Sequence, residues 1–317
     1  MEATHNPCLR ASFIRQVIEE RHPQRQKINK FEQRIVLLPK KSKNGGSMIT
    51  IDFSGKNALI TGGTRGIGLA TALLFGRAGA RTWLTYKWGQ DDYSALYAAF
   101  LEAGAPKPVL MQADVSVDED TSKLMAEMAE QGAEGVDFFI SNVGFAQRTM
   151  NLNEYKKRSL FKTLEYSTWP LISYSQAIRK TFGAYPRRII GISSDGPSHF
   201  YRGYDFVAAS KALLEHFARY MSIHLFEEGC RVNVIRFGSV KTESFSAIFG
   251  EAFFDYLRAN GIPEEMLLSP EECAQAVFAL ASGFMDAING QIITVDKGMP
   301  FRDNLMMRYQ ESREEQG

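Results

Sequence analysis

The chain has 317 residues, of which 44% are hydrophobic, so it can bury one large core, and nothing in its composition indicates repeats or general disorder. Its formal net charge of +1 gives no overall reason to expect nucleic acid or an anionic membrane as a partner. The three cysteines are too widely spaced to indicate a disulfide framework or a zinc site, and no apolar run approaches the roughly 18 residues that cross a bilayer. We expect a soluble, cytoplasmic protein without a bound metal.

Residues 1–47 differ from the rest of the chain, because they hold ten Lys and Arg against four Glu. The pattern predicts a short amphipathic helix at Ala11–Arg21, and the polar linker KKSKNGGS comes later in the same segment. We expect a poorly ordered basic extension, either a leader or the result of a start codon placed ahead of a functional start at Met48. A docking segment for a carrier or partner protein is the alternative, and the four glutamates argue against a mitochondrial targeting segment.

From Ile51 onward, short apolar runs alternate with helical periodicity, which predicts βαβ units and a parallel sheet covered on both faces. The predicted strands are Asn57–Ile60, Arg81–Tyr86, Pro108–Gln112, Val136–Ser141, Arg188–Ser193, Arg231–Ile235 and Gln291–Val295. Right-handed crossovers then produce a single doubly wound α/β (Rossmann) sheet, whose ligand crevice lies beyond the carboxyl ends of the strands. We assign this domain to residues 48–302 and a polar, frayed tail to residues 303–317.

A glycine-rich turn, TGGTRGIG at Thr61–Gly68, directly follows the first predicted strand and opens a helical run. Gly62 permits a tight turn, Gly66 lets the backbone approach a pyrophosphate, and Gly68 permits close packing of the helix. The helix N-terminus adds unpaired N–H groups and positive potential for the phosphates. This context predicts a dinucleotide site, with a purely structural glycine turn as the alternative.

The GxxxGxG spacing of this turn, together with four later segments, resembles the short-chain dehydrogenase/reductase family. The resemblance spans Met48–Phe301, and the four segments are ADVS at 113–116, SNVG at 141–144, FGSVKT at 237–242 and GQIITVDKG at 290–298. It implies that Asp114 contacts the adenine and that Asn142 and Gly144 line the ribose side. It also implies that Val240 and Thr242 hold the carboxamide and pyrophosphate. The full set of predicted cofactor-binding residues is Gly62, Thr64, Arg65, Gly66, Ile67, Gly68, Lys87, Asp114, Val115, Asn142, Gly144, Lys211, Val240 and Thr242.

The end of the second predicted strand indicates which dinucleotide binds. An enzyme that uses NAD needs an acidic residue there to bind two ribose hydroxyls, but the segment reads LTYKWG and contains none. Lys87 lies just past the strand and Arg65 lies in the glycine turn, so two cations could meet a 2′-phosphate. We therefore predict NADP(H) as the cofactor, with solvated surface cations as the alternative for each residue.

Proton-handling groups are expected in the stretch GISSDGPSHFYRGYDFVAASK, Gly191–Lys211. In the family, a tyrosine four residues before the lysine transfers the proton and the lysine binds the nicotinamide ribose, but that tyrosine position holds Val207. Ser194 keeps the place of the family's active-site serine, and the nearest phenol toward the N-terminus belongs to Tyr204. The resulting Tyr-x6-Lys spacing resembles the enoyl-acyl-carrier-protein reductases of the superfamily. We therefore predict Tyr204, Lys211 and Ser194 as the catalytic residues.

The changed spacing indicates the reaction. Seven helical residues rise about 10 Å, so Tyr204 and Lys211 would share a face but stand farther apart than in the four-residue spacing. Reduction of a conjugated C=C puts hydride on the β carbon and charge on a more distant thioester oxygen, which a displaced phenol can hydrogen-bond. Ser167, at the position of the family's relay asparagine, agrees with this chemistry. We predict an NADPH-dependent reductase of an enoyl thioester on a carrier protein or coenzyme A; a carbonyl reductase and an inactive cofactor-binding scaffold or sensor are the alternatives.

An insertion at residues 242–268 is rich in apolar and aromatic side chains, and it resembles the mobile helical lid of family members. Phe245, Phe249 and the loop residue Tyr201 are the predicted substrate contacts, and their apolar character suits an acyl or polyketide chain. Packing against the core or against a second copy is the alternative. By resemblance we also expect a homodimer or homotetramer, paired through the helices around strands four and five.

Overall fold

The structure is a computed structural model that describes residues 38–41, 47–89, 92–145, 147–243, 245, 250, 252–260, 262–302 and 306. The helix predicted at 11–21, the lid residue Phe249 and all of the predicted tail except Met306 lie outside the described residues. The chain divides into two units, Met1–Ile51 and Asp52–Gly317. In the first unit, strands β1 (Leu38–Lys41) and β2 (Ser47–Thr50) pair antiparallel at the two ends of the predicted polar linker, residues 40–47, where no strand is predicted.

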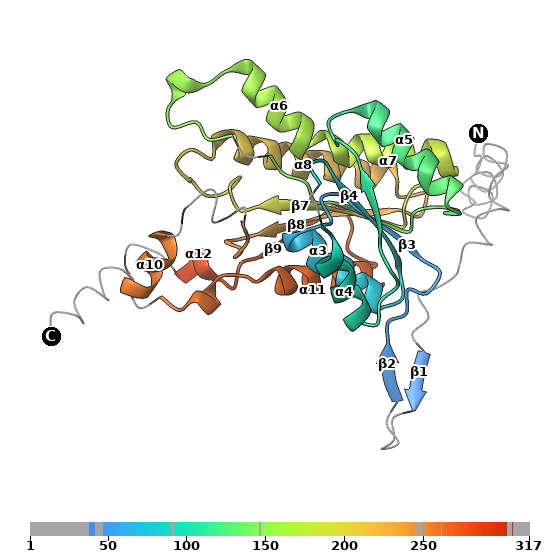
Figure 1. The fold of residues 1–317 in the computed structure, drawn as a ribbon. Coiled ribbons are helices and arrows are strands. Elements are labelled where there is room, and N and C mark those ends of the chain that lie inside the picture. The colour runs from blue at the N-terminus through green and yellow to red at the C-terminus, as the bar shows by residue number, and fades with distance from the viewer. Residues whose placement is uncertain are drawn as a thin grey trace, which may run out of the picture. The chain divides into compact units, whose positions relative to one another are not determined.

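The second unit contains one seven-stranded parallel sheet with the order β5-β4-β3-β6-β7-β8-β9 (Figure 1). The strand order reverses between β3 and β6, so the carboxyl ends of these two strands flank the crevice where such sheets bind ligands. The predicted doubly wound fold is confirmed, and the predicted strand ends differ from the observed ones by two residues at most. The strands are β3 (Asn57–Ile60), β4 (Arg81–Tyr86), β5 (Val109–Gln112), β6 (Phe138–Ser141), β7 (Arg188–Ser194), β8 (Arg231–Phe237) and β9 (Ile292–Val295).

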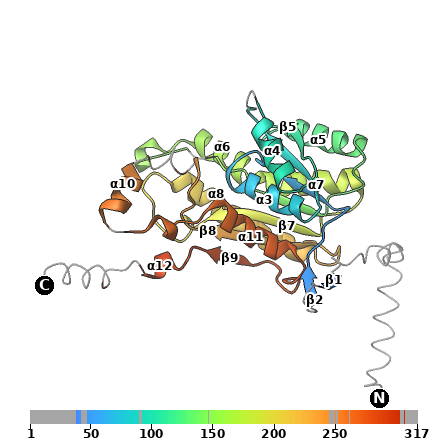
Figure 2. The ribbon, with the colours of Figure 1, turned by 60° about the horizontal axis from the view of Figure 1, so that its bottom comes forward.

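Helices cover both faces of this sheet (Figures 1 and 2). On one face α3 packs against α4 and α11, and on the other α5 and α6 pack against α7 and α8. Helix α10 and the short helix η2 lie within the predicted lid. The helices are α3 (Gly66–Arg77), α4 (Ser94–Glu102), α5 (Asp118–Glu130), η1 (Leu152–Glu154), α6 (Lys157–Ser167), α7 (Trp169–Phe182), α8 (Asp205–His224), α10 (Ala252–Ala259), η2 (Glu264–Met266), α11 (Pro270–Ala281) and α12 (Met299–Arg302).

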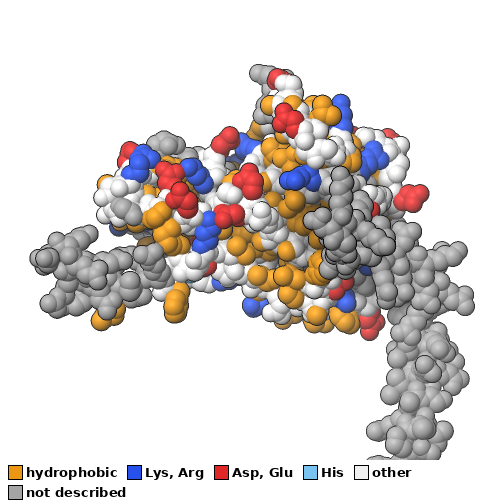
Figure 3. Space-filling model, turned by 90° about the horizontal axis from the view of Figure 1, so that it is seen from below, with side chains coloured by type: hydrophobic (Ala, Val, Ile, Leu, Met, Phe, Trp, Pro, Cys, Tyr) orange, Lys and Arg blue, Asp and Glu red, His pale blue; other side chains and the backbone are white. Residues whose placement is uncertain are grey.

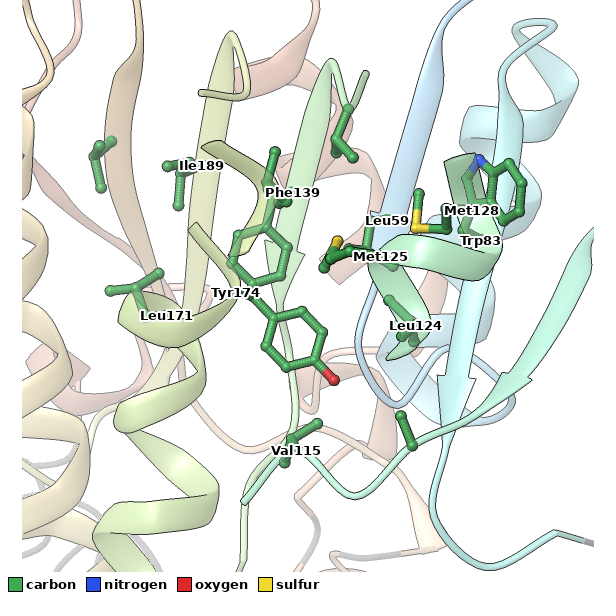
Figure 4. Close-up of a cluster of buried hydrophobic side chains, with 14 of the residues drawn as sticks. Leu59, Trp83, Val115, Leu124, Met125, Met128, Phe139, Leu171, Tyr174 and Ile189 are labelled. Carbon is green, nitrogen blue, oxygen red and sulfur yellow. The ribbon is translucent and has the colours of Figure 1, made fainter. Parts of the chain in front are cut away.

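Hydrophobic cores fill both spaces between sheet and helices. Between the sheet and α5, α7 and α8, the rings of Phe139 and Tyr174 stack with their centroids 5.6 Å apart (Figure 4). The other face is filled by an aromatic cluster of Phe53, Phe75, Phe138 and Phe278. Burial on both faces explains why the strand sequences read as apolar runs and not as alternating patterns. None of the described helices has the length and apolar character that a membrane crossing requires.

Candidate cofactor and active site

The glycine turn has the geometry that a dinucleotide site needs. Gly62 and Gly66 have positive φ angles of 62° and 53°, which glycine adopts without the steric cost of a Cβ. A Cβ at Gly68 would lie 2.3 Å from the carbonyl oxygen of Gly62, so only glycine allows α3 to pack this closely on the turn. Helix α3 begins at Gly66, within this glycine-rich segment, so its free N–H groups are available to an anion at the crevice. The backbone therefore fits a pyrophosphate.

Asn142, at the end of β6, braces the glycine turn. Its Nδ2 donates hydrogen bonds to the carbonyl oxygens of Thr61 (2.9 Å) and Gly62 (3.3 Å), and its backbone N–H donates to Thr61 Oγ1 (2.9 Å). Gly144, two residues further along, lies beside Lys211, because a Cβ at Gly144 would be 3.6 Å from Lys211 Nζ. The structure thus brings Gly144, a predicted ribose-side residue, to the predicted ribose-binding lysine, while Asn142 holds the turn.

Lys87, Asp114 and Tyr166 form a hydrogen-bonded cluster near the ends of β4 and β5. Lys87 Nζ lies 2.6 Å from Asp114 Oδ2, and the Tyr166 hydroxyl donates to the same oxygen at 3.0 Å while also contacting Lys87 Nζ. The hydrogen bond with Asp114 raises the pKa of Lys87. Burial acts to raise the pKa of Asp114, but hydrogen bonds from Lys87, Ser116 and Tyr166 lower it overall. Lys87 is therefore a charged group held in place, and Tyr166 is a site residue that no sequence motif marks.

A pocket of about 220 Å³ lies beside this cluster. The exposed Arg65, which precedes α3, lines it together with Lys87, so the two predicted cations share one pocket. The predicted cofactor residues Gly62, Thr64, Val115 and Gly144 also line it. Six predicted cofactor-binding residues, which come from four separate segments of the sequence, therefore line one cavity beyond the carboxyl ends of the strands.

Lys211 is buried in α8, with 6% of its surface exposed. Its Nζ donates a hydrogen bond to the carbonyl oxygen of Ile192 in β7, at 2.8 Å. Burial lowers the pKa of Lys211 to about 8, and the charge of Glu215 opposes this shift. The amino group is thus held between the end of β7 and Gly144, where its charge responds to pH near the physiological range.

Tyr204, the residue before α8, approaches Ser194 as the sequence predicts. Its hydroxyl donates to Ser194 Oγ at 3.2 Å. Its ring lies against Gly196, where a Cβ would come within 2.8 Å of a ring carbon, so a larger residue at 196 would displace the phenol. Burial raises the pKa of Tyr204, and the hydrogen bond with Ser194 offsets this only in part. The phenol therefore keeps its proton at neutral pH and can act as a hydrogen-bond donor.

The neighbouring phenol of Tyr201 has a different partner. Its hydroxyl donates to Asp195 Oδ2 at 2.6 Å, and Asp195 is buried, with 7% of its surface exposed. Burial, followed by the hydrogen bond with Asp195, raises the pKa of Tyr201. Tyr201 is therefore a less available donor than Tyr204, and Asp195 is a second site residue that sequence patterns do not reveal.

A second pocket, of about 190 Å³, brings together two of the three predicted catalytic residues and two of the predicted substrate residues, but Lys211 does not line it. Tyr201, Tyr204 and Ser194 line it together with Val240, Thr242 and Phe245. The ring centroid of Phe245 is 5.1 Å from that of Phe253 in α10, so a residue of the pocket wall packs against a helix of the predicted lid. Val240 also forms a parallel β-bridge with Leu268, which ties the two ends of the lid segment together.

Two positions at which the chain departs from the family pattern serve the structure. Ser167 Oγ accepts a hydrogen bond from the backbone N–H of Phe145 at 2.9 Å, so Ser167 holds the loop after β6. Val207 is buried in α8, with 5% of its surface exposed, and contributes apolar packing.

The fold, the glycine turn and the buried lysine define a Rossmann-type oxidoreductase. The family model described as enoyl-(acyl carrier protein) reductase matches residues 61–300, which is most of the chain. The chain therefore belongs to the short-chain dehydrogenase/reductase family, whose members use NAD(P).

Individual relatives cover most of this chain at modest identity. One is the 1-cyclohexenylcarbonyl-CoA reductase of Streptomyces collinus, 27% identical over 76% of this chain and 86% of that protein. Another is the 3-oxoacyl-[acyl-carrier-protein] reductase FabG of Chlamydia muridarum, 29% identical over 77% and 97%. A solved short chain dehydrogenase from Burkholderia cenocepacia in complex with NADP is similar in structure, with a TM-score of 0.68 and 26% identity over 78% of this chain and 99% of that one.

Proposed function

We propose that this protein is an NADPH-dependent reductase that acts on the C=C bond of an enoyl thioester carried by coenzyme A or an acyl carrier protein. The observation that carries this proposal is the position of Tyr204, whose hydroxyl lies beside Ser194 in the second pocket, while buried Val207 occupies the family's tyrosine position. The chain keeps a phenol in the pocket but not at the four-residue spacing from Lys211. The name of the Streptomyces relative denotes a reductase of an unsaturated acyl-CoA, which supports the same chemistry.

The residues present fit a dinucleotide. The glycine turn and the start of α3 would bind the pyrophosphate, since Gly66 leaves the backbone accessible. Lys211, beside Gly144, would hold the nicotinamide ribose. The bound cofactor supplies the hydride, and the first pocket would hold its adenosine half.

Tyr204 would stabilise the charge that develops on the substrate. When the β carbon of an enoyl thioester is reduced, negative charge develops on the thioester carbonyl oxygen. The protonated phenol can donate a hydrogen bond to this oxygen, with Ser194 as a second donor beside it. The positive charge of Lys211 also stabilises the negative charge on the substrate, and the apolar side chain of Phe245 helps to exclude water from the pocket.

NADPH is preferred over NADH in this proposal because of the charge around the first pocket. No acidic residue ends β4, where the chain continues from Tyr86 through Lys87 to Trp88. Asp114 neutralises part of the charge of Lys87, which leaves the exposed Arg65 as the main partner for a 2′-phosphate.

Reduction of a carbonyl, as in a 3-oxoacyl thioester, is the second candidate function. Tyr204 Oη and Ser194 Oγ lie 3.2 Å apart, so one carbonyl oxygen could contact both hydroxyls. The name of the Chlamydia relative denotes a 3-oxoacyl reductase.

NADPH oxidation with crotonyl-CoA and with acetoacetyl-CoA separates these functions. We expect turnover of crotonyl-CoA, and we expect Tyr204→Phe to lower kcat by about 10²-fold or more, since it removes the proposed donor to the charged oxygen. Tyr201→Phe is the matched control, because it deletes a phenol from the same pocket whose hydroxyl is already bound to Asp195. Turnover of acetoacetyl-CoA alone would show a carbonyl reductase, and NADPH binding without turnover of a broad substrate panel would show a scaffold or sensor.

The wider assignments are proposals as well. We propose one catalytic domain at residues 48–302, a substrate lid at 242–268, a homo-oligomeric assembly and a cytoplasmic location. The described lid elements, α10 and η2, and the contact of Phe245 with Phe253 support the assignment of the lid.

A further inference from the structure

Glu215 and Arg236 form a buried ion pair next to the second pocket. Glu215 lies on α8, one helical turn after Lys211, and Arg236 lies on β8. The Arg236 Nη2 and Nε atoms donate to Glu215 Oε2 and Oε1 at 2.6 Å and 3.0 Å, which makes the contact bidentate. The Glu215 side chain is 8% exposed and the Arg236 side chain is 18% exposed. The pair thus links the helix that carries Lys211 to the strand that leads into the cofactor loop at Val240.

The same pair holds the segment that leads to Tyr204 at two points. Ser193 Oγ donates to Glu215 Oε1 at 2.7 Å, and Ser193 is the residue before Ser194. Arg236 Nη1 donates to Ser198 Oγ at 2.6 Å, further along the same segment. Ser193 and Arg236 are also register partners in the β7–β8 ladder, so both side chains lie on the face of the sheet that α8 covers.

Stability alone does not explain why the protein contains this ion pair. Desolvation of two charges is unfavourable, and apolar residues of similar volume are often as stabilising, so such pairs are weak contributors to the free energy of folding. Four hydrogen bonds with defined directions offset the desolvation of Glu215 and Arg236. Such bonds fix the relative position of α8, β8 and the segment 193–198 more narrowly than apolar contacts do.

We propose that Glu215 and Arg236 are positioning residues that hold the segment 193–204, and with it the Ser194 and Tyr204 hydroxyls, in register with Lys211. This inference rests on the proposed roles of Tyr204 and Lys211 but not on whether a C=C or a C=O bond is reduced. Neither residue of the pair lines the second pocket, so both act through the residues that they hold.

Arg236→Met tests this role. With whichever of crotonyl-CoA and acetoacetyl-CoA the wild type reduces, we expect kcat to fall about 10-fold to 100-fold, the range that a displacement of about 1 Å in a reacting group can cause. We expect the Kd for NADPH to change by less than about threefold, since neither Glu215 nor Arg236 lines the first pocket, which would hold the adenosine half. Hydrogen–deuterium exchange in residues 193–204 of the NADPH complex should become faster.

Milder variants test the guanidinium geometry and the Arg236–Ser198 hydrogen bond separately. Arg236→Lys keeps the charge but loses the planar fork, so its kcat should lie between those of Arg236→Met and the wild type. Ser198→Ala removes only the Arg236–Ser198 bond and should produce a smaller fall in kcat in a protein that folds normally. Once Arg236 is replaced by Met, adding Glu215→Gln should lower kcat little further, because the two residues act as one unit.

Arg188→Met is the matched control. Arg188 is another arginine of this sheet that is paired with a carboxylate, 5% exposed and bound to Asp286, but it lies at the start of β7, away from the site. The Arg188→Met substitution should lower the Tm without changing kcat or exchange in residues 193–204.

The positioning role is wrong if Arg236→Met lowers only the Tm, as Arg188→Met does. If the wild type reduces neither thioester, the proposed function fails, and unchanged exchange in residues 193–204 of Arg236→Met would still overturn the positioning role.

Discussion

Lys211 is a residue whose charge near neutral pH depends on its surroundings. A lysine is charged below its pKa, and burial lowers the pKa of Lys211 to about 8, so the charge is lost as the pH rises through that value. We therefore expect kcat/KM to fall above about pH 8, because the neutral amine no longer supplies positive charge beside the nicotinamide ribose. Burial raises the pKa of Tyr204, so its own ionisation does not account for this fall. A pH–rate profile measures the effect.

Lys211→Arg provides the control for this prediction. A guanidinium stays charged throughout the accessible pH range, so the alkaline fall should disappear even if the absolute rate is lower. An unchanged alkaline fall in Lys211→Arg would assign the ionisation to another group.

Arg65 is the residue on which the choice between NADPH and NADH depends. It is exposed beside the first pocket, whereas Lys87 already pairs with Asp114. A hydrogen bond to a charged group contributes about 1.5–3 kcal/mol, so Arg65→Ala should weaken NADPH binding about 10-fold to 100-fold and leave NADH binding nearly unchanged. Fluorescence titration of both cofactors measures this. Arg77→Ala, an exposed arginine in the last turn of the same helix, is the control, and equal losses for NADPH and NADH in Arg65→Ala would contradict a role in 2′-phosphate binding.

At the scale of elements, the strands and the glycine turn could be predicted because their physical causes are local in sequence. Strands buried on both faces read as short apolar runs, and the turn needs glycine at Gly62, Gly66 and Gly68 for reasons of backbone conformation and contact. The spacing of Ser194, Tyr204 and Lys211 is also a local property. Fold class, cofactor class and the set of candidate side chains therefore follow from the sequence.

Contacts between elements could not be predicted in the same way. Lys87 meets Tyr166 of α6, and Glu215 of α8 meets Arg236 of β8, and no spacing rule relates these positions. Gly196 supports Tyr204 through the shape of a loop whose sequence has no periodic pattern. The sequence thus identifies which groups can do chemistry, while the fold determines how each is held.

At the scale of the whole molecule, exposed apolar side chains are the feature from which we predict an interface between copies of the chain. Large apolar residues on or beside α6, α7 and α8 are between 41% and 75% exposed. These residues are Phe161, Trp169, Tyr220, Ile223 and Phe226. Exposed apolar surface commonly marks a protein interface, and these helices precede and follow β7, in the part of the chain that runs from β6 to β8. Apolar side chains also spread across the opposite face, which carries α3, α4 and α11 (Figure 3).

We expect a dimer or tetramer that pairs through the α6–α8 face. Ile223, 75% exposed on α8, is the most exposed of these residues, and Ile223→Glu should shift the protein toward monomers because it buries a charge in the interface. Light scattering after size-exclusion chromatography at micromolar concentration measures the mass. Leu101→Glu is the control, since Leu101 is 81% exposed on α4 across the sheet. A wild type that is monomeric would contradict the assembly, and an oligomer that persists in Ile223→Glu would place the interface on another face.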